Sequence, residues 1–222
     1  MFSDTHYSAP KMLAPLMLAA FAGHVQADFR VMPYVQNPSP TAMTIMWFSD
    51  DAKVGTLSVA GIGSYLSTPV IAADLAYHAN EIENHFQGTD PGAPYLHRVR
   101  VEDLQPGSHY SYQVYQDGET FQAAFRTAPE YHQAVRFIVY ADSETEPEST
   151  GKTRRWSQPY GDWDRQYHVD QTEGYHQNLK VMQSRHPDFI AIAGDLVESG
   201  NEQRDWDEFW YHNAGSYGTL AS

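Results

Sequence analysis

Two aspartates stand directly after apolar runs, in a pattern that could hold a metal ion. Asp142 ends the run that begins at Val135, and Asp195 ends the run that begins at Asp188. Apolar runs of this length are typical of strands buried on both faces, as in parallel sheets. Ligands of such sheets bind beyond the carboxyl ends of the strands. Because carboxylates are hard oxygen ligands, the pattern predicts a metal site at Asp142 and Asp195.

The segment between the two runs predicts the element that would bring these aspartates together. Its pattern indicates a helix from about Glu173 to Arg185, which Pro187 ends. The whole unit is then strand, crossover helix and parallel strand. A single aspartate after a strand is more often the cap of the following turn. The repetition of the arrangement, with Gly194 before Asp195 in the second copy, favours metal binding instead.

Glu144 is a third candidate ligand, two residues after Asp142. Its carboxylate could bind the ion, orient a residue that does, or be solvated, and the sequence leaves these alternatives open.

The segment from Phe189 to Gly200 resembles the Gly-Asp motif of the calcineurin-like metallophosphoesterases, which include the purple acid phosphatases. The resemblance implies that Asp195 bridges two metal ions of iron, zinc or manganese and that Asp142 binds one of them. It further implies a phosphatase-like hydrolase that acts on phosphate esters through a hydroxide between the ions. Glu144 stands where the family has His or, in the purple acid phosphatases, Gly.

The chain also departs from this family. The motifs Gly-Asn-His and Gly-His-x-His, which carry the family's remaining ligands, are absent, and Glu198 stands where the purple enzymes have a ligand Tyr. No catalytic acid or base can be assigned. We therefore expect residues 134–222 to be the first part of an α/β metallophosphoesterase domain truncated at the carboxyl terminus. The fragment alone is expected to be inactive.

Residues 28–128 predict an all-β domain that precedes the α/β part. Strand-like segments include Thr44 to Phe48 and Leu96 to Val101, and Asp117-Gly118 is a hairpin signal. The stretch from Leu104 to Val114 resembles the fibronectin type III pattern, with Tyr110 as the corner tyrosine. Trp47 is the candidate core aromatic. The expected fold is thus multi-domain: a fibronectin type III-like sandwich followed by a partial α/β domain, the domain order of plant-type purple acid phosphatases.

The amino terminus predicts export. Lys11, the apolar run from Met12 to Gly23 and the small residues at Val25-Gln26-Ala27 are typical of a signal peptide covering residues 1–27. The protein is then secreted or periplasmic, with no membrane association after cleavage. No pattern in the sequence predicts the oligomeric state.

Composition excludes several functions. The formal net charge of −14 disfavours binding to nucleic acid, and the absence of cysteine excludes disulfides and thiolate metal sites. A rival hypothesis is that the chain is a non-catalytic, secreted binding module, in which the sandwich contacts glycans or proteins. Such a module would not need two strand-end aspartates.

Overall fold

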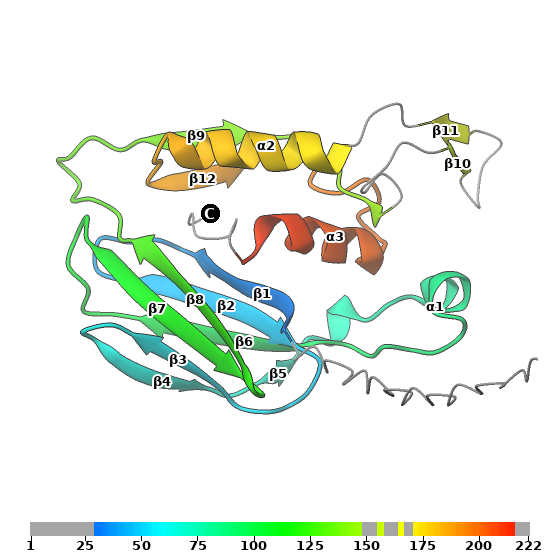
Figure 1. Cartoon of the computed structure of the whole chain (residues 1–222), viewed down its shortest axis with the longest axis horizontal. Helices are drawn as coiled ribbons and strands as arrows, with labels where there is room; N and C mark the ends of the chain where they lie inside the picture. Colours follow the sequence, from blue (N-terminus) through cyan, green and yellow to red (C-terminus); the bar gives the residue numbers. More distant parts are fainter. Residues whose placement is uncertain (1–28, 148–154, 158–163, 167–170, 216–222) are drawn as a thin grey trace, which may run out of the picture.

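The computed structural model of the chain describes residues 29–147, 155–157, 164–166 and 171–215. Figure 1 shows a β-sandwich, a second layer built from strand and helix, and a helix between the two layers. The expected signal peptide lies outside the described residues. Among the described residues, no helix combines the length and hydrophobicity needed to cross a bilayer. The expectation of an all-β amino-terminal domain is confirmed.

The sandwich consists of two sheets of four strands, in the orders β1-β2-β6-β5 and β4-β3-β7-β8. Its strands are β1 (Phe29–Gln36), β2 (Met43–Ser49), β3 (Gly55–Val59), β4 (Gly63–Ser67), β5 (Val70–Ile71), β6 (Tyr95–Val101), β7 (His109–Gln116) and β8 (Glu119–Arg126). Asp117 and Gly118 connect β7 to β8 with φ values of 41° and 98°. Positive φ at both central residues is what a type I′ hairpin requires, so the predicted turn is confirmed.

Trp47 lies at the centre of the sandwich core, as predicted. Its side chain is fully buried, and its Nε1–H donates a hydrogen bond to Gln116 Oε1 at 3.1 Å. Gly55 must be glycine here, because a Cβ atom would lie 2.5 Å from Gln116 Oε1 and 2.6 Å from the Trp47 ring. The indole and the amide thus fix the distance between the two sheets at this point.

Tyr110 makes the predicted corner. Its hydroxyl oxygen accepts a hydrogen bond from the backbone N–H of Gln105 at 2.8 Å, and the neighbouring Leu104 is buried in the core. The bond ties β7 to the turn that leads into it, as in the corner of fibronectin type III domains.

His97 makes the stability of the sandwich depend on pH. Its ring is fully buried and stacks on Trp47 with centroids 4.8 Å apart, and its Nε2 lies 2.9 Å from Ser49 Oγ. Burial lowers the pKa of His97 below the ordinary value of 6.5. The unfolded chain therefore binds a proton near pH 6.5 that the folded chain does not bind until lower pH.

We expect the free energy of unfolding to be highest above pH 6.5 and to fall as the pH drops below it, by up to about 1.4 kcal/mol per pH unit. Urea denaturation at pH 7.5 and at pH 5.5 measures this difference, and His97→Phe should reduce it. An equal pH difference in the wild type and in His97→Phe would show that another group is responsible.

The segment between β5 and β6 was not predicted, because residues 28–128 indicated strands alone. It contains a 3₁₀ turn, η1 (Ala73–Leu75), and a short helix, α1 (Ala79–His85). Glu81 of α1 is buried, and its carboxylate accepts hydrogen bonds from the backbone N–H groups of His78 at 2.9 Å and Arg204 at 3.0 Å. The segment therefore connects the sandwich to a residue far along the chain.

The predicted unit of strand, helix and parallel strand is present. It consists of β9 (Phe137–Tyr140), α2 (Gln171–Ser184) and β12 (Phe189–Ile192). The two strands are parallel, with Phe137 paired to Phe189 and Tyr140 paired to Ile192. Between β9 and α2 the structure describes a short antiparallel pair, β10 (Arg155–Ser157) and β11 (Asp164–Gln166). In-register pairing places the carboxyl ends of β9 and β12 side by side.

Helix α3 (Gln203–Asn213) packs against the sandwich. The ring of Trp210 stacks on Tyr34 of β1 with centroids 4.3 Å apart. Ala214 shares a buried cluster with Val31, Tyr34, Met46 and Phe48. Figure 1 shows α3 between the sandwich and the β9–α2–β12 layer. Strand β2 is consequently buried on both faces, by the sandwich core on one and by this cluster on the other.

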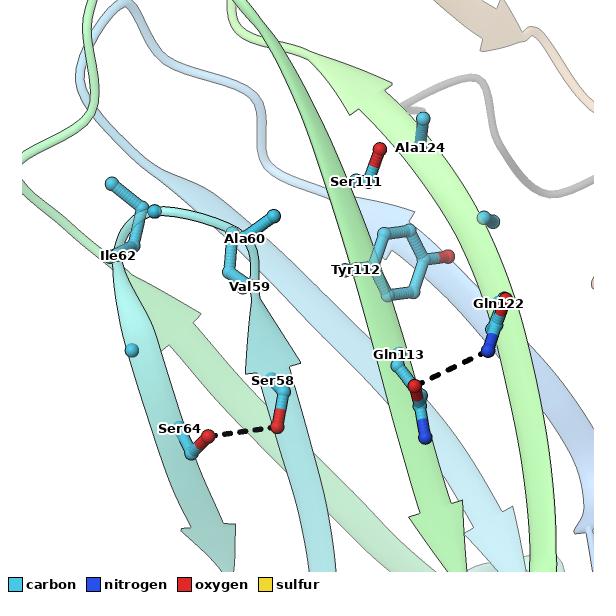
Figure 2. Close-up of a pocket in the computed structure, with 13 residues that line it drawn as sticks. Ser58, Val59, Ala60, Ile62, Ser64, Ser111, Tyr112, Gln113, Gln122 and Ala124 are labelled. Atoms are coloured by element: carbon cyan, nitrogen blue, oxygen red, sulfur yellow. Dashed lines mark hydrogen bonds between the residues drawn. The ribbon is translucent and has the colours of Figure 1, made fainter.

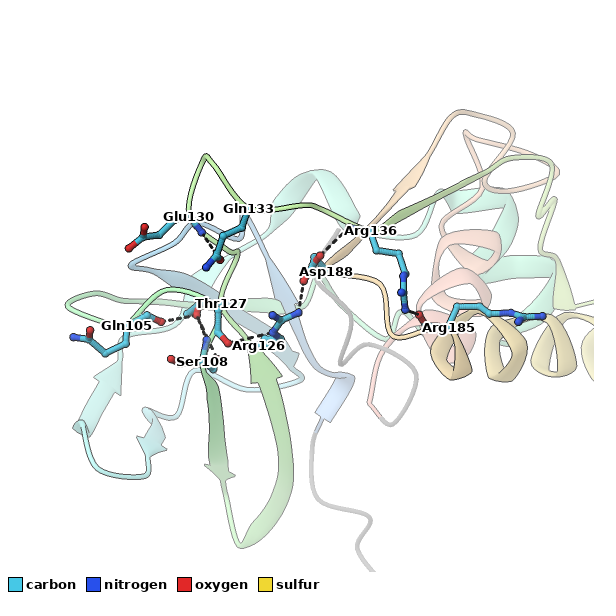
Figure 3. Close-up of polar contacts among 10 residues, drawn as sticks. Gln105, Ser108, Arg126, Thr127, Glu130, Gln133, Arg136, Arg185 and Asp188 are labelled. Atoms are coloured by element: carbon cyan, nitrogen blue, oxygen red, sulfur yellow. Dashed lines mark hydrogen bonds and ion pairs between the residues drawn. The ribbon is translucent and has the colours of Figure 1, made fainter.

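A second junction joins the sandwich to the start of the parallel strands. The Asp188 carboxylate pairs with Arg126 at the end of β8 and accepts the backbone N–H of Arg136 at 2.9 Å. Arg136 in turn donates from Nη1 to the Arg185 carbonyl oxygen at 2.6 Å, at the end of α2. Figure 3 shows Asp188 between the two arginines. The amino-terminal ends of β9 and β12 are thus fixed to the sandwich, opposite the ends that carry Asp142 and Asp195.

Candidate metal centre

The loops that follow β9 and β12 continue side by side beyond the strands. The backbone N–H of Asp142 donates to the Gly194 carbonyl oxygen at 3.2 Å, and that of Glu144 donates to the Asp195 carbonyl oxygen at 3.0 Å. Thr145 forms a parallel bridge with Val197. These bonds hold the two acidic loops in a fixed register, so the apolar strands and their short continuation determine where the carboxylates lie.

Asp142, Glu144 and Asp195 come together in space. Each offers one carboxylate oxygen such that the three atoms lie within 4.8 Å of one another, and all three residues are exposed. We call these residues the acidic triad. The structure therefore groups Glu144 with the two aspartates, where the sequence left its role open.

The backbone at the acidic triad is unusual. All three residues have positive φ, 58° at Asp142, 37° at Glu144 and 47° at Asp195. Left-handed conformations are uncommon outside glycine and cost of order 1–3 kcal/mol in sparsely populated regions. Such residues concentrate at functional sites, and here the three turns direct the carboxylates toward one point.

The donor set of the acidic triad fits one hard cation. Oxygen ligands lie about 2.0 to 2.6 Å from Mg²⁺ or Ca²⁺, so two oxygens on opposite sides of an ion are about 4 to 5 Å apart. The 4.8 Å limit on the triad falls in this range. Ionised carboxylates at this separation also repel one another, and a cation between them would remove that repulsion. Carboxylate oxygens suit magnesium, calcium and manganese.

His176 of α2 lies outside the acidic triad and contacts α3 instead. Its Nε2 lies 2.9 Å from His212 Nδ1, and His212 Nε2 lies 2.8 Å from Glu208 Oε1. His212 is buried, so this polar pair joins α2 to α3. In the described part of the chain, no histidine is grouped with the acidic triad.

A hollow of about 280 Å³ lies beside the acidic triad. It is lined by Asp142 and its neighbours at the end of β9 together with side chains of α2, among them Asn178, Val181 and Met182. One wall of the candidate metal centre is therefore open enough to admit a small group.

A second hollow lies elsewhere, on the sandwich. It measures about 760 Å³ and surrounds the β3–β4 hairpin. Figure 2 shows its polar lining, with hydrogen bonds between Ser58 and Ser64 and between Gln113 and Gln122. Its lining contains no carboxylate, histidine or basic side chain, so this hollow offers neither metal ligands nor a charged group for catalysis.

Comparison with known proteins gives a family for the first half of the chain. Residues 29–134 match the family model described as "Purple acid Phosphatase, N-terminal domain". No curated protein matches the sequence. One solved structure that matches is titled "Structure of PhoD", with 11% identity and a TM-score of 0.48. That alignment covers 88% of this chain and 38% of the other, so the chain spans well under half the length of that protein.

The sandwich therefore matches the amino-terminal domain of the purple acid phosphatases. The matched range ends at residue 134, close to the start of β9 at Phe137. The acidic triad thus lies outside the part that the family model covers.

Proposed function

We propose that this chain is part of an exported, metal-dependent phosphoesterase of the phosphatase type. The observation that carries the proposal is the convergence of Asp142, Glu144 and Asp195 at the ends of two parallel strands. The match of residues 29–134 to the purple acid phosphatase amino-terminal domain supports it. A non-catalytic binding module would have no use for three carboxylates held within 4.8 Å.

In this proposal the acidic triad would be one part of a centre for two metal ions. Bound ions of this kind would supply a metal-activated hydroxide for attack on phosphorus and neutralise charge on the phosphoryl oxygens. Asp142, Glu144 and Asp195 would hold one ion with their three carboxylate oxygens, which do not suffice for two. The remaining ligands and the acid that protonates the leaving group would come from outside the described residues.

The ligand count predicts that the 222-residue chain alone does not hydrolyse an aryl phosphate, even with iron, zinc or manganese in excess. A longer product, if the reading frame continues past Ser222, should show metal-dependent hydrolysis that Asp195→Asn abolishes. The test is to measure hydrolysis of 4-nitrophenyl phosphate by both proteins. A longer product without metal-dependent hydrolysis would contradict the proposed function. Turnover by the short chain that Asp195→Asn abolishes would show that the ligand set is already complete.

A further inference from the structure

A half-buried network of hydroxyl and amide groups lies next to Asp142 of the acidic triad. It consists of Tyr140 at the end of β9, Tyr175 on α2 and Asn213 at the end of α3, and we call it the tyrosine network. The Tyr175 hydroxyl donates to Asn213 Oδ1 at 2.7 Å, and the Tyr140 hydroxyl lies 2.9 Å from that of Tyr175 and 3.2 Å from Asn213 Oδ1. Three elements distant in sequence therefore meet at one amide oxygen.

The orientation of the Asn213 amide is fixed. Its Nδ2 donates to the Phe209 carbonyl oxygen at 2.8 Å, one helical turn earlier, so Oδ1 must face the two tyrosines.

The tyrosine network lies against the loop that carries Asp142 and Glu144, because Tyr140 and Tyr175 line the same hollow as Asp142 and Ser143. Ser143 stands between Asp142 and Glu144 and donates from Oγ to the Leu196 carbonyl oxygen at 2.9 Å, which joins the two acidic loops. Loss of the Tyr175 hydroxyl would remove the bond between α2 and Tyr140, two residues before Asp142.

Helix α3 fixes the other end of the network to the sandwich. Trp210 stacks on Tyr34, and the backbone N–H of Gly215 donates to the Pro33 carbonyl oxygen at 3.1 Å, on either side of Asn213. The position of the acidic loop therefore depends, through Tyr175 and Asn213, on the contact of α3 with strand β1 of the amino-terminal domain.

We propose that Tyr140, Tyr175 and Asn213 are positioning residues for the acidic triad, which couple its metal affinity to the docking of α3 on the sandwich. This inference rests on the proposed function, because it requires that the acidic triad binds an ion. None of the three residues needs to touch that ion. Outer-shell partners of metal ligands typically change affinity by about 10- to 100-fold.

The test is titration of the 222-residue chain with Mn²⁺, in which electron paramagnetic resonance measures the free ion. Tyr175→Phe should weaken Mn²⁺ binding about 10-fold at a temperature well below its melting point. Tyr140→Phe is the second variant, in case Tyr175→Phe folds poorly. Because the residues act as one network, the Tyr140→Phe, Tyr175→Phe double variant should lose less than the product of the single losses.

Tyr112→Phe is the matched control. The Tyr112 hydroxyl is buried in the sandwich with no hydrogen-bond partner, so its removal should leave Mn²⁺ affinity unchanged. Wild-type affinity in both Tyr175→Phe and Tyr140→Phe would overturn the positioning role and leave the metal site intact. Failure of the wild-type chain to bind Mn²⁺, or binding that Asp195→Asn does not change, would overturn the metal site itself and the positioning role with it.

Discussion

Asp195→Asn is expected to weaken Mn²⁺ binding by about 100-fold or more. Even partners outside the ligand shell change affinity by about 10- to 100-fold, and this substitution removes a charge from one of three direct ligands. The asparagine has the same shape, and the loop bonds near residue 195 are made by the backbone, so the fold should persist. Isothermal titration calorimetry with Mn²⁺ measures the change.

Glu198→Gln is the matched control for that measurement. Glu198 is an acid three residues further on, and it is not a member of the acidic triad. The Glu198→Gln variant should therefore bind Mn²⁺ as the wild type does, apart from a small effect of net charge. Equal losses in Asp195→Asn and Glu198→Gln would mean that general negative charge, and not a defined site, attracts the ion.

Among these variants, Trp47→Ala should cause the largest loss in the free energy of unfolding. Truncation of a fully buried tryptophan costs about 3 to 5 kcal/mol through lost burial and the cavity that remains. Gln116 Oε1 would also lose its donor in the core, which adds roughly 1 to 3 kcal/mol. The free energy of unfolding of a whole domain is about 5 to 15 kcal/mol, so the variant is expected to be close to unfolding at room temperature.

Urea denaturation followed by tryptophan fluorescence or circular dichroism tests this expectation. Tyr131→Ala removes an aromatic side chain that is 99% exposed, so it should change stability by no more than about 0.5 kcal/mol. A Trp47→Ala protein within about 1 kcal/mol of the wild type would show that the core collapses around the gap without loss.

The convergence of Asp142 and Asp195 could be predicted, because the signal lies in short segments of the sequence. The apolar runs before Asp142 and Asp195 encode strands, and the helix between them makes the strands parallel, so the ends must meet. The contribution of Glu144 could not be decided, because it depends on a positive φ two residues beyond Asp142, and a glutamate gives no sequence signal for that conformation.

The placement of α3 could not be predicted, for a different reason. The spacing of Phe209 and Trp210 indicates which face of the helix is buried but not which surface covers it. That surface is formed by β1 and β2 of the sandwich, where Met46 and Phe48 belong to the buried cluster on which Trp210 packs. The available sequence signal was the absence of charged residues from Thr44 to Phe48, which is typical of a strand buried on both faces.

Helix α1 could not be predicted from the sequence, because it is held by contacts to residues far away in the chain. Residues 79–85 contain only one large apolar side chain, Ile82, and so lack the periodic pattern of a helix packed on a core. Glu81 supplies the signal in retrospect, as a carboxylate three residues after the N-cap residue His78, whose backbone N–H donates to it. Its second bond, to the N–H of Arg204, could only be seen in the fold.

The most direct test of the account is to locate a bound ion. Crystals of the chain grown with Mn²⁺ allow the ion to be placed by its anomalous scattering. The account predicts a peak among Asp142, Glu144 and Asp195, with a carboxylate oxygen of each about 2.0 to 2.6 Å away. Well-ordered loops at 142–145 and 194–197 with no peak between them, or a peak only at His176 and His212, would contradict it.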